Sequence, residues 1–92
     1  MIVQLSVSAK AEYDAALAFL DARSPSAADS LQDRIETALV SLAELPDRGR
    51  PGGLHGAREL PVRNTPYVVV YTVEAERVSI IRVRHTSQDP SP

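Results

Sequence analysis

The chain has 92 residues, of which 43% are hydrophobic and 24% are charged, and its formal net charge is −2. This length suits one small domain, and the composition is that of a globular chain rather than a disordered one. The absence of cysteine excludes a disulfide framework, a thiolate metal site and a cysteine nucleophile, and it is compatible with a reducing cytoplasm. No apolar run approaches the roughly 20 residues of a membrane span, so we expect a cytoplasmic protein without a membrane partner.

The charge is unevenly distributed along the chain. Residues 1–46 carry a net charge of −4 and residues 47–92 a net charge of +2, and every cation of the second half is an arginine. The planar guanidinium group suits bidentate contacts with carboxylates or phosphates. A nearly neutral domain lacks the dominant cationic face that sequence-independent nucleic-acid binding needs. We therefore do not expect strong, sequence-independent binding of nucleic acid.

The first half of the sequence predicts a strand and two helices. Residues 2–7 alternate between apolar and polar side chains, which is typical of a strand. Apolar residues at helical spacing predict helices over 9–23 and 26–45. Ser8 is the predicted cap of the first helix, and a capping box that begins at Ser26 opens the second. The second helix has an apolar stripe that should face the sheet: Leu31, Ile35, Leu39 and Leu42.

The second half predicts a loop followed by three strands. Residues 46–56 begin with a proline and hold all four glycines of the chain, which indicates a mobile connector. Alternating or continuous apolar side chains then predict strands over 57–63, 66–73 and 77–85. A short turn joins the last two of these strands.

The order of the predicted elements indicates an α+β fold. A helical hairpin should pack on one face of a mainly antiparallel four-stranded sheet, in the chain order β-α-α-β-β-β. One hydrophobic core should hold these elements together. We therefore expect a single domain spanning residues 1–92, with a flexible tail at 86–92.

The most distinctive polar cluster is the string "RVRHTSQDP" at residues 82–90. Arg82 and Arg84 alternate on one face of the last predicted strand, and His85 ends that strand. The two arginines either form a contact surface or pair with acids in solvent, and His85 either packs against the strand end or transfers protons. The acids available for such pairs are Glu59, Glu74 and Glu76. The cluster predicts an exposed arginine-rich surface more readily than a catalytic centre.

The remaining polar and aromatic residues favour structural roles. His55 and His85 are too sparse for a metal site, so we expect no metal and no cofactor. The glycine-rich segment lacks the spacing of a phosphate-binding loop and follows a helix rather than a strand. Tyr67 and Tyr71 share one strand face, where packing is their expected role.

Several strings, in this order and at this spacing, resemble the RelE/ParE family of toxins from bacterial type II toxin–antitoxin modules. They are "SPSAAD", "SLAELPDRG", "GARELPV", "PYVVVYTV" and "VSIIRVRHTSQDP", and together they span nearly the whole chain. The resemblance implies the same α+β fold and a small protein antitoxin as partner. It also implies one of two activities. RelE-like members are ribosome-dependent endoribonucleases that cleave mRNA, whereas ParE-like members act, where the target is known, by poisoning DNA gyrase.

The RelE-like branch would assign catalysis to Arg63, Arg82 and His85. The arginines would offset the developing charge on the phosphate, and the histidine would be the general acid or base. However, Val68 stands where that branch has an arginine in its central strand, the second half has no lysine, and the net charge is negative. The ending "HTSQDP" is closer to the ParE-like one. We therefore expect a growth-inhibiting binding protein rather than an enzyme, with gyrase as its target.

The residues predicted to contact the target or the antitoxin are Arg58, Arg63, Arg82, Arg84 and His85. Two alternatives stay open. One is a RelE-like endoribonuclease that acts on mRNA with the ribosome, and the other is a degenerate toxin that retains only antitoxin binding.

Overall fold

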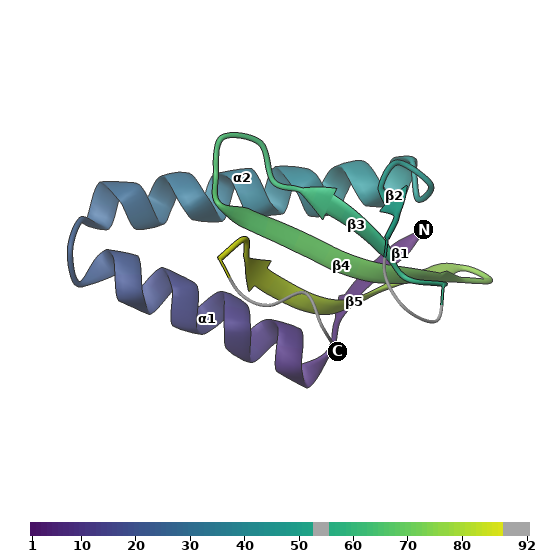
Figure 1. Ribbon diagram of the computed structural model, residues 1–92, viewed down its shortest axis with the longest axis horizontal. Helices are drawn as coiled ribbons and strands as arrows, with labels where there is room; N and C mark the ends of the chain where they lie inside the picture. Colours follow the sequence, from purple (N-terminus) through teal and green to yellow (C-terminus); the bar gives the residue numbers. More distant parts are fainter. Residues whose placement is uncertain (53–55, 88–92) are drawn as a thin grey trace.

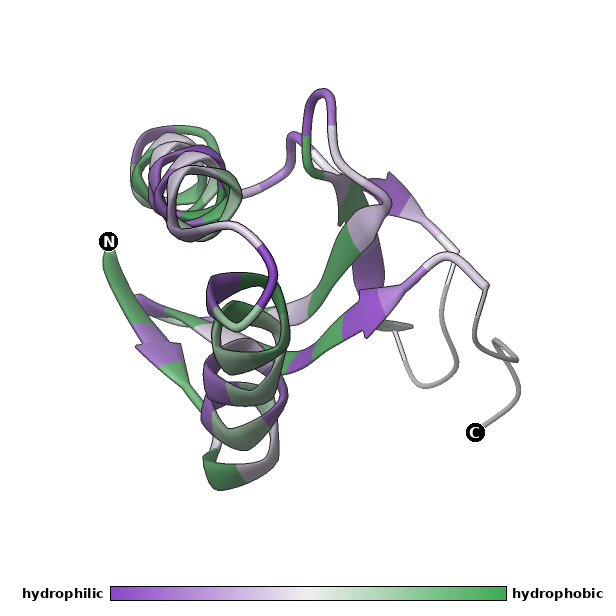
Figure 2. Cartoon of the chain, turned by 90° about the vertical axis from the view of Figure 1, so that its left-hand side faces the viewer, coloured by the Kyte–Doolittle hydropathy of each residue, from purple (hydrophilic) through white to green (hydrophobic). Residues whose placement is uncertain are grey.

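The computed structural model describes residues 1–52 and 56–87 (Figure 1). Its two helices form a hairpin on one face of the sheet (Figure 2), which confirms the predicted α+β class. Most of the predicted tail, and His55, lie outside the described residues. Neither helix in the described part has the length and apolarity of a membrane-spanning segment. The elements are β1 (Ile2–Leu5), α1 (Val7–Asp21), α2 (Pro25–Glu44), β2 (Arg50–Pro51), β3 (Arg58–Pro61), β4 (Tyr67–Glu74) and β5 (Arg77–His85).

The sheet has five strands, one more than predicted, in the order β1-β5-β4-β3-β2. β1 runs parallel to β5, and all other neighbours are antiparallel. The additional strand β2 consists of Arg50 and Pro51, which pair with Glu59 and Arg58. Two residues are too few to show the alternation that marks a strand in a sequence. The prediction of a connector without regular structure was therefore wrong at this point.

α1 begins earlier than predicted, because Ser6 and not Ser8 is its cap. The Ser6 side chain accepts a hydrogen bond of 3.0 Å from the backbone N–H of Ala9. The backbone N–H of Ser6 still donates to the carbonyl of Ile80 at 2.9 Å. One residue thus ends the pairing of β1 with β5 and starts the helix, which shortens the predicted strand.

α2 is also capped by a different serine from the predicted Ser26. The Ser24 side chain accepts from the backbone N–H of Ala27 at 3.3 Å. Pro25 takes the first helical position, where the missing N–H of proline costs nothing. The predicted capping box was therefore misplaced by two residues.

The core lies between the helical hairpin and the sheet. In α2, Ile35 and Leu42 are fully buried, whereas Leu39 is only partly buried at the margin of the same cluster. The apolar stripe of α2 thus faces the sheet, as predicted. Burial of one such aliphatic side chain contributes roughly 1.5–3 kcal/mol. The sheet contributes Leu60, Val69, Tyr71, Val78, Ile80 and Val83 to this core, and Val62 joins it from just beyond the end of β3.

The segment after α2 is held by two side chains of the sheet. The hydroxyl of Tyr71, which is fully buried, accepts from the N–H of Gly49 at 2.7 Å and donates to the carbonyl of Pro46 at 2.8 Å. Arg58, its cross-strand neighbour, donates to the carbonyls of Gly49 at 2.7 Å and Asp47 at 3.2 Å. A Cβ on Gly49 would lie 2.5 Å from the Tyr71 hydroxyl oxygen. The first part of the predicted connector is therefore fixed against the sheet.

One polar contact joins the two helices. The Tyr13 hydroxyl of α1 donates to a carboxylate oxygen of Glu36 in α2 at 3.4 Å. Burial, together with the negative charge of Glu36, raises the pKa of Tyr13 to about 12. The protonated phenol is therefore favoured in the folded chain.

Replacing Tyr71 by Phe should lower the free energy of unfolding by about 1–3 kcal/mol, because the polar groups of Pro46 and Gly49 lose their buried partner. Urea denaturation of the two chains measures this difference. Tyr67→Phe is the matched control, since no hydrogen bond of the Tyr67 hydroxyl is found in the described residues. Equal midpoints for Tyr71→Phe and the parent chain would refute the role of this hydroxyl.

A second prediction concerns alkaline pH. Because the folded pKa of Tyr13 is raised, its contribution to stability is complete below the ordinary tyrosine pKa of about 10 and is lost as pH rises toward about 12. Tyr13→Phe should therefore lose less stability than the parent chain over this interval. Thermal melts at both ends of the interval measure it, and identical losses in the two chains would contradict it.

Candidate functional site

The end of β5 does not form the exposed arginine surface that the sequence predicted. Val83 points into the core between sheet and helices, so its neighbour Arg84 leaves the strand on the other side. Arg84 is only 8% exposed. The prediction was wrong for this residue, because alternation along a strand gives the face of a side chain but not what covers that face.

Arg84 forms a buried ion pair on the sheet face away from the helices. Its guanidinium group lies 3.0 Å from a carboxylate oxygen of Glu59 in β3. Arg50 of β2 approaches the other oxygen of Glu59 at 3.7 Å. Valines pair opposite both residues in β4: Val68 with Arg84 and Val70 with Glu59. Glu59 was one of the predicted acids, but the pair is buried instead of solvent-exposed. Removing either partner would leave the other charge buried without a counter-ion.

Arg82 is bound to α1 through a glutamate that the sequence analysis did not identify. It donates to one carboxylate oxygen of Glu12 at 2.8 Å, and the backbone N–H of Val83 donates to the other at 2.9 Å. β1 pairs with β5 only as far as Ile80, so Glu12 satisfies the strand edge beyond that point. A signal was present in the sequence, since Glu12 lies at helical spacing between the buried Ala9 and Ala16.

His85 ends β5 and contacts both the strand beside it and the residues after it. Its Nδ1 accepts a hydrogen bond from the backbone N–H of Ser87 at 3.1 Å and lies 2.7 Å from the Ser87 hydroxyl. Its ring packs edge-to-face on Tyr67, with the centroids 5.2 Å apart. Because Nδ1 is an acceptor here, the neutral ring carries its proton on Nε2. The histidine is thus a packing residue that also borders a groove with Phe19 and Tyr67.

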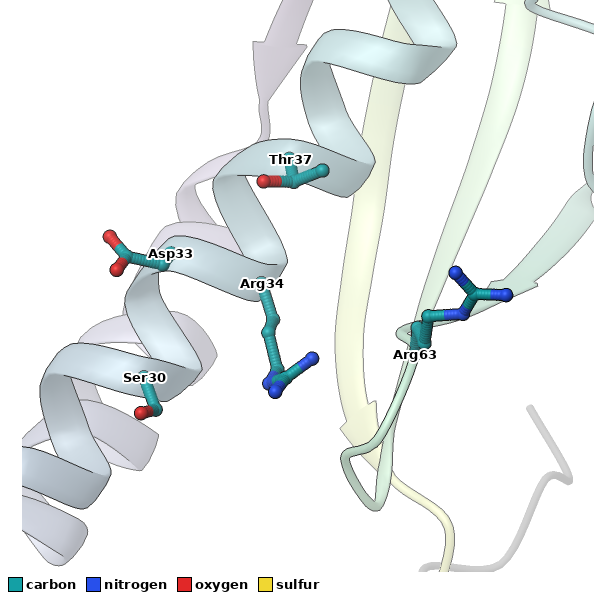
Figure 3. Close-up of a pocket in the computed structure, with 5 residues that line it drawn as sticks. All are labelled: Ser30, Asp33, Arg34, Thr37 and Arg63. Carbon is teal, nitrogen blue, oxygen red and sulfur yellow. The ribbon is translucent and has the colours of Figure 1, made fainter.

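The other two predicted contact residues have different environments. Arg58 faces the loop after α2 and holds it, as described above, with a further contact of 3.8 Å to the Asp47 carboxylate. Arg63 is exposed in the turn between β3 and β4, where it borders a hollow of about 300 Å³ beside α2. That hollow (Figure 3) adjoins one of the two that His85 borders, because Ser30 and Arg34 line both. The five predicted residues therefore do not converge on one surface.

The three residues of the hypothetical ribonuclease site have different contacts. Arg82 pairs with Glu12, His85 contacts Ser87 and Tyr67, and Arg63 borders another hollow. Among the described residues, no group of three or more metal-binding side chains lies close enough to hold an ion.

Comparisons with known proteins place the chain in a family. The model of the ParE toxin of type II toxin–antitoxin systems, parDE, matches residues 3–90. Toxin RelE1 of Caulobacter vibrioides is 36% identical over 85 residues, which cover 90% of each chain. The putative toxin Y4kP of Sinorhizobium fredii is 38% identical over 71 residues, which cover 77% of this chain and 73% of the relative.

The fold agrees with that result. A structure of the chromosomal ParDE toxin–antitoxin system from P. aeruginosa superposes with a TM-score of 0.82, covering 92% of this chain and 95% of that one at 22% identity. At this identity the likeness concerns the fold alone. Since the family model spans almost the entire sequence and the helical hairpin on its sheet matches, the chain belongs to the ParE family of type II toxin–antitoxin toxins, within the wider RelE/ParE group.

Proposed function

We propose that the chain inhibits growth by poisoning DNA gyrase and is neutralised by a cognate antitoxin. The observation that carries this choice is that two of the hypothetical catalytic groups are already engaged within the chain: Arg82 is paired with Glu12, and His85 packs on Tyr67 and accepts a hydrogen bond from Ser87. The match of the ParE toxin model supports the same choice. In this proposal the chain acts by binding, in the cytoplasm, and is not an enzyme.

Ribosome-dependent cleavage of mRNA is the second candidate. It is favoured by the similarity to proteins named toxin RelE1 and toxin RelE2 of Caulobacter vibrioides, the latter 45% identical over 65 residues. It is also favoured by the position of His85 on a groove. A degenerate toxin that only binds its antitoxin is the third possibility, and absence of any growth inhibition would identify it.

The antitoxin has one suitable sheet edge to bind. β1 and β2 are the two edge strands, but β2 has two residues and ends in Pro51, which makes it a poor template for a further strand. β1 is longer, and its Ile2 side chain is 70% exposed. The N-terminal amine of Met1 donates to the carbonyl of Ala43 at 3.0 Å, which holds this end of the chain against α2. An extended antitoxin segment can add to β1 through main-chain hydrogen bonds.

The target can be tested through His85. In a gyrase poison, His85→Gln should keep most of the toxicity, because glutamine retains a polar side chain but cannot act as an acid or a base. In a ribonuclease that uses this histidine as acid or base, the same change should lower the cleavage rate by roughly 10²–10⁴-fold. The assay measures growth inhibition together with gyrase-linked DNA breaks and cuts in ribosome-bound mRNA.

Ser87→Ala is the matched control for that experiment, since it removes a contact of the imidazole and leaves the ring. Arg84→Glu is unsuitable, because it would place a second carboxylate beside the buried Glu59. One result would refute gyrase poisoning and favour the RelE-like activity: the parent chain makes codon-specific mRNA cuts that vanish in His85→Gln, and no DNA breaks occur at any dose.

Antitoxin binding should depend on both charge and the β1 edge. Association should slow as salt rises, because the arginines of the second half attract an acidic partner.

Ile2→Lys should weaken the complex although it adds a favourable charge, since a charged side chain on an edge strand opposes strand addition. Ala18→Lys, on the exposed surface of α1, is the control for the added charge. Surface plasmon resonance with the product of an adjacent gene measures both effects. Equal affinity of the two variants would refute docking at β1.

A further inference from the structure

The outer edge of β1 exposes backbone hydrogen-bonding groups of two residues. The N–H of Ile2 donates to the carbonyl of Glu76 at 3.4 Å, and the N–H of Ser6 also points toward β5, as described above. Because these groups alternate between the two sides of a strand, the N–H and C=O groups of Val3 and Leu5 point away from β5. Figure 2 shows the strand that begins at the N-terminus at the margin of the sheet, with no helix on its outer side. Among the described residues, none binds these outward groups.

This edge also lacks the features that commonly keep edge strands apart. Such edges are protected by a charged side chain, a proline or a bulge. Residues 1–7, MIVQLSV, contain no charged side chain and no proline. Three of their apolar residues are strongly exposed: Met1 by 49%, Ile2 by 70% and Val7 by 89%. Covering them is favourable, and a second copy of this strand brings no like-charged side chains against the first.

We propose that two copies of the chain associate by antiparallel pairing of their β1 strands, about a two-fold axis that passes between the two Gln4 residues. In this register Val3 of each copy pairs with Leu5 of the other, and each such pair exchanges two hydrogen bonds. All the outward groups of both residues are then satisfied. The association is closed, because a two-fold contact uses the same edge of both copies and leaves no β1 edge for a third.

The exposed apolar side chains fit this register. Ile2 lies two residues before Gln4 and Ser6 two residues after it, so Ile2 of one copy lies opposite Ser6 of the other. Met1 of one copy then comes beside Val7 of the other at each end of the contact. Two strands of this length bury less than the roughly 1,200 Å² of a stable interface, so the dimer is weak and depends on concentration.

The neighbouring registers are less suitable. A shift by two residues in one direction pairs Leu5 with Met1 of the second copy, and the amine of Met1 is engaged with the carbonyl of Ala43. A shift in the other direction pairs Val3 with Val7 of the second copy, which belongs to α1. Only pairing about Gln4 uses extended backbone throughout.

Self-pairing protects the free chain. An open edge strand can recruit further chains into unlimited aggregates, whereas the two-fold pair ends at two copies. If an antitoxin adds to β1, strand addition and self-pairing exclude one another, and this one consequence rests on the proposed function. The dimer itself requires neither an antitoxin nor a target.

Cysteine cross-linking tests the axis, because the chain has no cysteine of its own. Gln4 is exposed, and in the proposed pair its Cα lies about 4.5 Å from that of the second Gln4, within the span of a disulfide. Gln4→Cys should therefore give a covalent dimer on a non-reducing gel after mild oxidation. Ile2→Cys is the matched control on the same exposed face. The two copies of residue 2 lie about 14 Å apart, so they should not be linked.

Charge exchange at the axis tests the same contact without a covalent bond. Sedimentation equilibrium of the parent chain should show a shift from one chain to two as concentration rises. Gln4→Lys should weaken this association roughly tenfold, because two lysines then face each other beside Arg77, which lies 3.2 Å from the Gln4 amide oxygen. An equal mixture of Gln4→Lys and Gln4→Glu should restore it by pairing lysine with glutamate. Gln32→Lys, the same change on the exposed surface of α2, should leave the association unchanged.

Three outcomes would overturn the proposal. One is a parent chain that stays monomeric at millimolar concentration. Another is cross-linking of Ile2→Cys as readily as Gln4→Cys, which indicates random collision or a different register. The third is a mixture of the Gln4→Lys and Gln4→Glu chains that associates no more than Gln4→Lys alone. All these measurements use the isolated chain, so their failure leaves the proposed function intact, and a chain without growth inhibition leaves the dimer intact.

Discussion

The structure depends on how the edge of β5 is covered, because this strand joins β1, β4 and α1. β1 pairs with it only up to Ile80, where the register with β4 shifts between Val70 and Tyr71. The Ile81 carbonyl then accepts a bond of 3.3 Å from the Ser6 hydroxyl, and the Glu12 carboxylate binds the N–H of Val83. Side chains of Ser6 and Glu12 thus provide the hydrogen bonds to β5 that β1 provides up to Ile80. These bonds satisfy the buried polar groups of the edge and fix α1 on the sheet.

The need to satisfy buried polar groups also explains why few arginines of the second half remain available to a partner. Arg82 pairs with the Glu12 that covers the strand edge, Arg84 pairs with Glu59 across β4, and Arg58 holds the loop after α2. Arginine suits these positions, because its several donors satisfy more than one acceptor at once. A cluster that resembles a functional surface in the sequence therefore contributes largely to the fold, and among the described residues the cations without a side-chain partner lie elsewhere, at Arg34, Arg48 and Arg63.

The fold was largely predictable from the sequence and the site was not, for one physical reason. Helices and strands follow from the spacing of apolar residues over a few positions, so the stripe of Ile35 and Leu42 and the central strand β4 were evident. The partners of Arg84 and Arg82 are 25 and 70 residues away, and no local pattern reports such pairs. The two-residue strand β2 was missed for the related reason that its existence depends on β3.

The parallel pairing of β1 with β5 also bears on the order of folding. Ile2 pairs with Arg77, whereas the helical hairpin and the β3-β4-β5 meander are built from neighbours in the chain. Contacts between distant residues form late, because a long loop must close, at a cost in chain entropy, before the contacts can lower the free energy. We expect the meander and the helices to assemble first and β1 to join last. The edge strand on which an antitoxin would dock is then completed only in the final step, so a chain that has not finished folding has no such edge to offer.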